Sequence, residues 1–179
     1  MLEHFKEKRN RIAWGITGAG YFLQECVDII KKQCDIDIFL SRAAQEVLAS
    51  YQLLEVLDTP GHRVFRDSSA SAYAVTKLYK EYYSAVVIAP VTSNSIAKMA
   101  MGISDTLVTN LFAHAGKCRV PLFVLPCDWE TEVTSSTPKG DFVQVYPRSI
   151  DLENIERLAS WPGVTVVGTP LELLDHLAY

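Results

Sequence analysis

A chain of 179 residues that is 49% hydrophobic and 21% charged is typical of one globular domain with its own core. Its net charge of −4 argues against a nucleic-acid-binding surface, and no apolar run is long enough to span a membrane. The four cysteines include no C-x-x-C pair, so we expect no metal or iron–sulfur site. Residues 1–10 mix charges with little apolar content, which predicts a solvated leader before a cytoplasmic domain of residues 11–179, and no signal peptide.

The predicted elements alternate between strands and helices. Short runs rich in β-branched residues predict strands at 11–17, 36–40, 62–67, 83–88, 121–126, 143–146 and 164–168. Apolar residues at helical spacing predict helices at 23–34, 42–51, 73–82, 96–103 continuing through 105–115, 151–160 and 170–177, with Asp151 as a cap and a helix end at Gly116. Residues 127–141 are predicted to form a loop with a turn at 138–140. This alternation predicts a single α/β domain of the Rossmann-like, three-layer class with a parallel sheet.

The centre of the chain is the stretch that follows the buried strand 83–88. It runs through Ala89 and Pro90 into a cluster of small polar residues where a helix begins, namely Thr92, Ser93, Asn94 and Ser95. Such a cluster places side-chain oxygens and free backbone N–H groups at the carboxyl edge of a sheet, where ligands of open α/β proteins bind. The alternative is that these residues only cap the helix.

A second candidate site follows the first strand, in a glycine-containing turn. Thr17, Gly18, Ala19 and Gly20 precede a helix, and their backbone N–H groups could hold a phosphate; the alternative is a tight turn that binds nothing. The glycine order is not the G-x-G-x-x-G dinucleotide fingerprint. Asp37 starts the second strand, whereas a ribose-binding acid should end it, and Ser41 stands there instead. The pattern therefore favours a mononucleotide over NAD.

Three segments together resemble the flavoprotein family. They are Gly15-Ile16-Thr17-Gly18-Ala19, Ser41-Arg42-Ala43-Ala44, and the central motif from Ala89 to Asp105 with Ala89-Pro90-x-Thr92-x-Asn94-Ser95. The family includes the homo-oligomeric flavin-containing cysteine decarboxylases. Trp14 and the tail 148–158 resemble the archaeal-type branch, which includes dihydromethanopterin reductases. The resemblance covers residues 11–126 and implies a flavodoxin- or decarboxylase-like fold in which residues 11–179 bind FMN.

The resemblance also implies roles for single residues. Ser41 would contact the FMN tail, although it could equally be an ordinary helix cap. Ser68 could contact the ligand, or belong to an ordinary serine-rich loop. Residues Pro90, Thr92, Ser93, Asn94 and Ser95 would surround the flavin ring, and the amide of Asn94 offers the donor and the acceptor that such a ring needs. Tyr21 or Trp129 could stack on the flavin or on a second aromatic ligand.

Two departures separate the chain from the family's decarboxylases. Thr76 stands where they carry a histidine, and threonine cannot perform that acid–base chemistry near neutral pH. Pro126-Cys127-Asp128-Trp129 replaces their P-x-M-N-x-x-M signature. Decarboxylase chemistry therefore lacks its usual residues here, and no acid–base residue is evident, since the four histidines lie outside every motif.

The leading hypothesis is an FMN-dependent reductase that converts dihydromethanopterin to the tetrahydro form. Its redox donor would be NAD(P)H or a protein such as ferredoxin, and the resemblance implies a homo-oligomer. The alternatives are an electron-transfer flavoprotein that works with a ferredoxin, a decarboxylase or prenyl-transferring relative, and a non-catalytic nucleotide-binding module.

Overall fold

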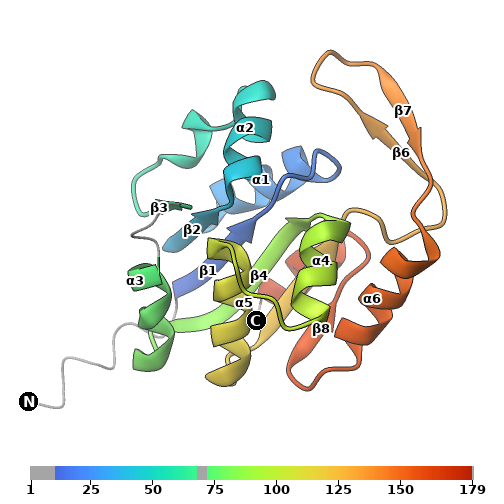
Figure 1. Ribbon diagram of the computed structural model, residues 1–179. Helices are drawn as coiled ribbons and strands as arrows, with labels where there is room; N and C mark the ends of the chain where they lie inside the picture. Colours follow the sequence, from blue (N-terminus) through green and yellow to red (C-terminus); the bar gives the residue numbers. More distant parts are fainter. Residues whose placement is uncertain (1–10, 68–71, 179) are drawn as a thin grey trace, which may run out of the picture.

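The computed structural model describes residues 11–67 and 72–178, and its centre is a parallel sheet (Figure 1). The strands of this sheet are β1 (Arg11–Ile16), β2 (Ile36–Leu40), β3 (Arg63–Arg66), β4 (Tyr83–Val91), β5 (Leu122–Pro126) and β8 (Val164–Val166). Their order across the sheet is β3-β2-β1-β4-β5-β8, with every pair parallel. The prediction of a Rossmann-like parallel sheet is thus confirmed. With the strands of this sheet numbered along the chain, this is the Rossmann order 3-2-1-4-5-6 and not the flavodoxin order 2-1-3-4-5. Successive strands are added on one side of β1 and then, from β4 onward, on its other side, so the strand order reverses between β1 and β4.

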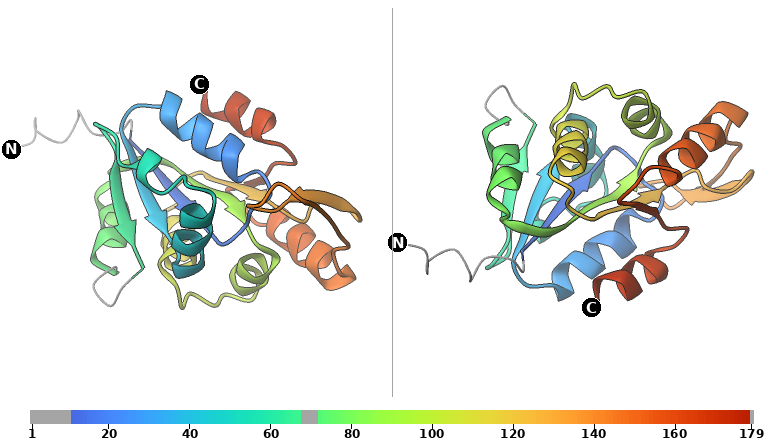
Figure 2. Two further views of the ribbon diagram at one scale, coloured as in Figure 1. Left: turned by 90° about the horizontal axis from the view of Figure 1, so that it is seen from above. Right: turned by 90° about the horizontal axis from the view of Figure 1, so that it is seen from below.

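Helices cover both faces of the sheet. One apolar cluster joins the sheet to α1 (Leu23–Lys32), α2 (Arg42–Ser50) and α7 (Pro170–Leu177). The other joins it to α3 (Ala72–Val75), α4 (Ser93–Ala100), α5 (Leu107–Lys117) and α6 (Ser149–Ala159). Figure 2 shows α1 and α7 together on one side and α5 and α6 on the other. Burial on both faces explains why β2 and β4 are nearly continuous apolar runs.

The strand β4 is longer than the sequence predicts, reaching Val91 instead of ending at 88. Its pairing with β5 shifts register between Ile88 and Val91, which leaves two carbonyl groups to be paired from β1. The buried indole of Trp14 donates its Nε1–H to the carbonyl of Ala89 at 2.7 Å. The backbone N–H of Thr17 donates to the carbonyl of Pro90 at 3.2 Å, so β1 holds the end of β4 in place.

Helix boundaries differ from the prediction in the middle of the chain. Residues 73–82 form the short helix α3 and a 3-10 segment, η3 (Thr76–Lys80). The helix α4 ends at Ala100, where Gly102 adopts a φ of +75°, and Ile103 is 48% exposed, so its predicted place on the apolar face is wrong. A separate helix, α5, begins at Leu107 and continues through Gly116, which does not end it.

The start of α6 also differs from the prediction. The capping residue is Arg148, and Asp151 is the third residue of the helix. The carboxylate of Asp151 accepts the backbone N–H of Arg148 at 2.9 Å, so it satisfies a free donor of the first turn from inside the helix.

A β-hairpin replaces most of the predicted loop at 127–141. It consists of β6 (Val133–Ser136) and β7 (Phe142–Val145), which pair antiparallel and project from the body of the domain (Figure 1). The prediction missed β6 because only Val133 of its four residues is buried, so no apolar alternation marks it. The predicted turn at 138–140 joins the two strands, and Tyr51, the C-cap residue of α2, donates its hydroxyl to the carbonyl of Ser136 at 2.6 Å.

A short 3-10 segment, η2 (Glu55–Leu57), follows α2 and buries Leu57.

Candidate functional site

A cleft of about 520 Å³ opens at the carboxyl edge of the sheet, around the ends of β1, β2, β3 and β4. This is where the strand order reverses, the usual ligand position of open α/β sheets. The lining residues are Thr17, Gly18, Ser41, Arg42, Ala43, Asp67, Thr92, Asn94, Ser95, Asp105 and Thr106.

Three helices direct their N-termini at this cleft, and each is capped by a lining hydroxyl residue. Ser41 caps α2, accepting the N–H of Ala44 at 3.0 Å. Thr92 caps α4, and Thr106 caps α5. Each N-terminus leaves backbone N–H groups without helical partners and carries partial positive charge. Together with Arg42, these termini make the cleft an anion-binding site.

Thr17 joins the two halves of the site. Its hydroxyl accepts the backbone N–H of Thr92 at 2.8 Å and lies 3.3 Å from the carbonyl of Pro90, to which it donates. Only 2% of Thr17 is exposed. Its hydroxyl donor is therefore used within the protein, and the bond from Thr92 fixes the position at which α4 begins.

The glycines of the first turn allow close packing against α2. A Cβ on Gly18 would lie 2.7 Å from the Cβ of Ala43, and one on Gly20 would lie 2.7 Å from the hydroxyl of Tyr51. Gly18 thus brings the turn against the start of α2 at the rim of the cleft. Gly20 allows a similar close approach to Tyr51, the C-cap residue of α2, and does not line the cleft.

The structure brings together a majority of the residues predicted for the site. Thr17, Gly18, Ser41, Thr92, Asn94 and Ser95 line the cleft. Outside the lining lie Ala19, Gly20, Pro90 and Ser93, whose roles toward a ligand stay predictions. Ser93 instead donates its hydroxyl to the carboxylate of Asp128. Ser68 is outside the described residues.

Lining residues that the sequence interpretation did not single out include Arg42, Asp67, Asp105 and Thr106. A signal existed for Asp67, the last residue of the predicted strand 62–67, which ends at the same sheet edge. Arg42 and Asp105 stand in the family motifs quoted above but were given no role, and Thr106 falls inside the predicted helix 105–115.

Two carboxylates balance the positive helix ends in the cleft. Asp105 pairs with Lys98, with its two oxygens 2.7 and 3.0 Å from the ammonium nitrogen, and this hydrogen bonding lowers the pKa of Asp105. Asp67 follows β3, where its backbone N–H donates to the carbonyl of Leu40 at 3.0 Å. A carboxylate accepts hydrogen bonds from hydroxyl groups, so the cleft can hold a ligand that carries both an anion and hydroxyls.

The side chains at the decarboxylase-specific positions have no catalytic arrangement. Thr76 is exposed, donates its hydroxyl to the carbonyl of Tyr73 at 2.7 Å, and is not part of the cleft. Burial, reinforced by the charge of Asp128, raises the pKa of the Cys127 thiol far above neutrality, so it supplies no thiolate nucleophile. The absence of decarboxylase residues inferred from the sequence is consistent with this geometry.

The two aromatic residues proposed for stacking are not among the cleft-lining residues. Tyr21 packs against Phe22 with ring centroids 4.0 Å apart, and burial together with Glu130 raises its pKa. Trp129 is 41% exposed, and its indole nitrogen would lie 3.6 Å from a Cβ on Gly168. Stacking of either ring on a ligand stays a prediction.

Asp37 takes no part in the cleft. It lies near the amino end of β2, is fully buried and is bound by cations, as the sequence argument against a ribose-binding role implies. Within residues 11–67 and 72–178 there is no group of three or more His, Cys, Asp or Glu side chains that could hold a metal ion. Over the same ranges, every helix is too short or too polar to cross a membrane.

A doubly wound sheet with a cleft of helix N-termini at its switch point defines a nucleotide-binding α/β protein. The chain belongs to the flavoprotein family, whose model matches residues 2–176.

Three relatives are informative. The dihydromethanopterin reductase (acceptor) of Methanosarcina mazei is 30% identical over 233 residues, covering 92% of this chain and 98% of that protein. The crystal structure of Burkholderia xenovorans DmrB in complex with FMN, described as a cubic protein cage for redox transfer, is 42% identical with a TM-score of 0.85, covering 97% of this chain and 95% of that one. Phenylacrylic acid decarboxylase from Aquifex aeolicus, 23% identical with a TM-score of 0.67 over 95% and 97% of the two chains, shares the fold.

Proposed function

We propose that this protein is an FMN-dependent oxidoreductase that reduces a dihydropterin, with dihydromethanopterin as the substrate. The observation that carries the proposal is the cleft itself, in which three helix N-termini and Arg42 face two carboxylates and an amide. The likeness to an FMN-bound structure and to dihydromethanopterin reductases supports the choice of cofactor and substrate.

The lining residues fit the parts of FMN. The N-terminus of α2 can receive the phosphate, since it is capped by Ser41 and begins with Arg42. Asp67 can accept hydrogen bonds from ribityl hydroxyls. Asn94, in the first turn of α4, can pair with a ring edge that carries N–H and C=O groups. The cleft volume of about 520 Å³ is within the range of cofactor sites.

When bound, FMN supplies hydride transfer, a chemistry that no side chain of the protein provides. The protein's residues bind and orient the reacting ring. Thr17 holds the start of α4 and with it Asn94, while Lys98 holds Asp105 at the cleft. The donor of electrons in this proposal is NAD(P)H or another low-potential donor that visits the site, because the chain lacks the dinucleotide fingerprint.

The proposal includes a homo-oligomer in which the hairpin β6–β7 lies between copies. Every residue of β7 is exposed, and Phe142 and Tyr146 are 77% and 68% exposed. Large exposed aromatic side chains on one projecting element are typical of an interaction surface. The described cage of DmrB supports a second copy of the chain as the partner.

Anaerobic stopped-flow spectroscopy tests the reaction. Enzyme loaded with FMN and reduced beforehand is mixed with dihydromethanopterin, and flavin absorbance is followed. We expect rapid reoxidation of the flavin with formation of the tetrahydropterin. A flavin that stays reduced with the dihydropterin but is reoxidised rapidly by a ferredoxin would contradict the proposal and favour an electron carrier.

A further inference from the structure

A second pocket lies at the opposite, amino edge of the sheet, beside the first residues of β3 and β4. It has a volume of about 320 Å³ and is lined by Arg63, Tyr73, Thr76, Lys77, Lys80, Glu81 and Tyr82. It shares no lining residue with the carboxyl-edge cleft. Three cationic side chains and two tyrosine rings thus share this pocket with one lining carboxylate, Glu81.

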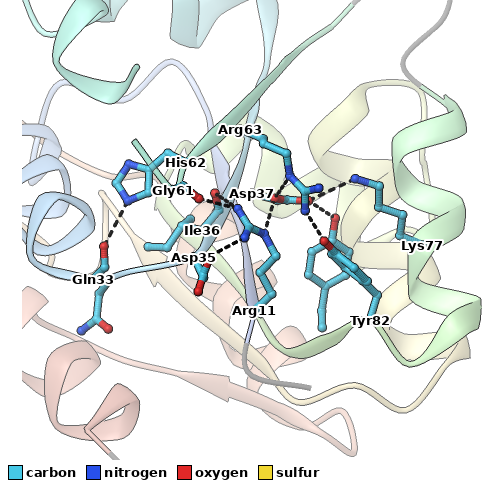
Figure 3. Close-up of polar contacts among 11 residues, drawn as sticks. Arg11, Gln33, Asp35, Ile36, Asp37, Gly61, His62, Arg63, Lys77 and Tyr82 are labelled. Atoms are coloured by element: carbon cyan, nitrogen blue, oxygen red, sulfur yellow. Dashed lines mark hydrogen bonds and ion pairs between the residues drawn. The ribbon is translucent and has the colours of Figure 1, made fainter. Parts of the chain in front are cut away.

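The positive charge of the pocket is held in place by one buried carboxylate (Figure 3). Asp37 is fully buried, and its oxygens accept from Arg63 at 2.7 and 2.9 Å, from Arg11 at 2.7 Å and from Tyr83 at 2.7 Å. The ammonium of Lys77 lies 3.3 Å from the same carboxylate. One carboxylate thus faces three cations, and Arg11 has a second partner in Asp35. An excess of positive charge remains on the side of the pocket.

Arg63 and Lys77 are therefore fixed before any ligand arrives. In the guanidinium of Arg63, Nε and Nη2 donate to the carboxylate of Asp37, and Nη2 also donates to the hydroxyl of Tyr82. The guanidinium carbon lies 5.3 Å from the Tyr82 ring centroid. The ammonium of Lys77 lies over the rings of Phe65 and Tyr82, at 4.7 and 5.3 Å. Fixed donors lose little conformational entropy when they bind an anion.

Donors remain for a ligand on these side chains. Within the described part of the chain, no partner is present for Nη1 of Arg63 or for the ammonium of Lys80. Arginine and lysine together favour phosphate, which the guanidinium meets with paired N–H donors. Glu81, which also lines the pocket, has its own interaction partner.

The aromatic part of the pocket points to the rest of the ligand. Tyr73 is 78% exposed on α3, and the ring of Tyr82 lies among the cations. Exposed rings next to cations are a platform on which a nucleobase stacks. The volume is sufficient for a group of nucleotide size.

We propose that this amino-edge pocket binds the phosphate and base of a nucleoside monophosphate unit, either a free nucleotide or one end of a larger one. The phosphate contacts Arg63, Lys77 and Lys80, and the base packs on Tyr73. The site is separate from the cleft and does not depend on the function proposed for it.

Isothermal titration calorimetry with AMP tests the site on the full-length chain saturated with FMN, so that the carboxyl-edge cleft is not open to AMP. Wild-type protein binds AMP at one saturable site, and adenosine and inorganic phosphate each bind at least fivefold more weakly, because each lacks one half of the contacts. Lys80→Ala and Tyr73→Ala each weaken AMP binding about fivefold or more, since a hydrogen bond to a charged group or a stacked base is lost. Lys139→Ala, the same substitution at an exposed lysine of the hairpin turn, leaves the AMP affinity unchanged.

Three results would overturn the proposal. The first is that AMP fails to bind, or that the Lys80→Ala and Lys139→Ala variants bind AMP equally well. Phosphate alone binds as tightly as AMP, in which case the pocket takes a simple anion. Asn94→Ala abolishes AMP binding while Lys80→Ala does not, which places the nucleotide in the carboxyl-edge cleft. Titrating NADPH alongside AMP distinguishes a free nucleotide from one end of a larger one. If Lys80→Ala weakens NADPH binding and AMP binding by the same factor, the pocket accepts the end of the larger nucleotide.

Discussion

The substitution Thr17→Val tests how the candidate site is held together. The hydroxyl of Thr17 accepts the N–H of Thr92 at 2.8 Å and donates to the carbonyl of Pro90 at 3.3 Å, and valine keeps the shape of the side chain while removing both bonds. The carbonyl of Pro90 keeps the backbone N–H of Thr17 as a donor, whereas the N–H of Thr92 loses its acceptor. Leaving such a donor unsatisfied costs about 1–3 kcal/mol.

This cost is large enough to measure in two ways. For a domain of this size, about 1–3 kcal/mol lowers the midpoint of thermal unfolding by roughly 2–12 °C. FMN binding weakens about two- to tenfold if half of the cost, about 0.5–1.5 kcal/mol, is lost from the preorganised start of α4. Thermal unfolding by circular dichroism measures the first effect, and fluorescence titration with FMN measures the second.

The control is Thr165→Val on β8, a partly buried threonine that lies outside the cleft. It removes the same hydroxyl with no effect expected on FMN affinity. If Thr17→Val and Thr165→Val have the same unfolding midpoint and the same FMN affinity, Thr17 does not position the site.

Three further predictions concern the ion cluster, the cleft and the hairpin. Asp37→Asn lowers the free energy of unfolding by about 3–5 kcal/mol, since it removes the buried carboxylate that three partly buried cations share, whereas Asp35→Asn at the exposed partner of the same cluster costs about 0–1 kcal/mol; equal urea midpoints would refute this. Burial alone would raise the pKa of Asp37, but its hydrogen bonds lower the pKa below its usual value. The ionised carboxylate therefore stabilises the fold above the unfolded-state pKa, and this stabilisation is lost as pH falls through the folded-state pKa. The difference in unfolding free energy between wild type and Asp37→Asn should shrink in acid. Asn94→Ala weakens FMN binding by about 1–3 kcal/mol, whereas Asn110→Ala, outside the cleft, does not, and titrations that find the two alike would exclude Asn94 as a ligand contact. Phe142→Glu yields a smaller assembly by light scattering with an unchanged circular dichroism spectrum, and an assembly of unchanged size would rule out the hairpin as the interface.

Much of the fold could be predicted because buried parallel strands are apolar on both faces. The runs at 36–40 and 83–88 are short, β-branched and bounded by turn residues, and each is a strand. The helix at 170–177, with its proline in the first turn, matches the prediction in full. The hairpin strand β6 was missed since it buries only Val133 and obtains its pairing from β7.

The candidate site was predicted in part for a related reason. Thr17, Ser41 and Thr92 directly follow strands, and the carboxyl ends of parallel strands share one edge, so local sequence places them together. Thr106 enters the cleft only because α4 ends at Ala100 and the chain turns back before α5, a break that helical periodicity did not show. The cations around Asp37 come from three separate elements, β1, β3 and η3, and their convergence depends on the strand order.

The most direct test of the central claim, that the cleft at the strand reversal binds FMN, is the absorption spectrum of the purified protein. We expect a yellow preparation with the two visible bands of an oxidised flavin, from which heat releases FMN in a ratio approaching one per chain. A colourless preparation that also fails to quench the fluorescence of added FMN would contradict the claim.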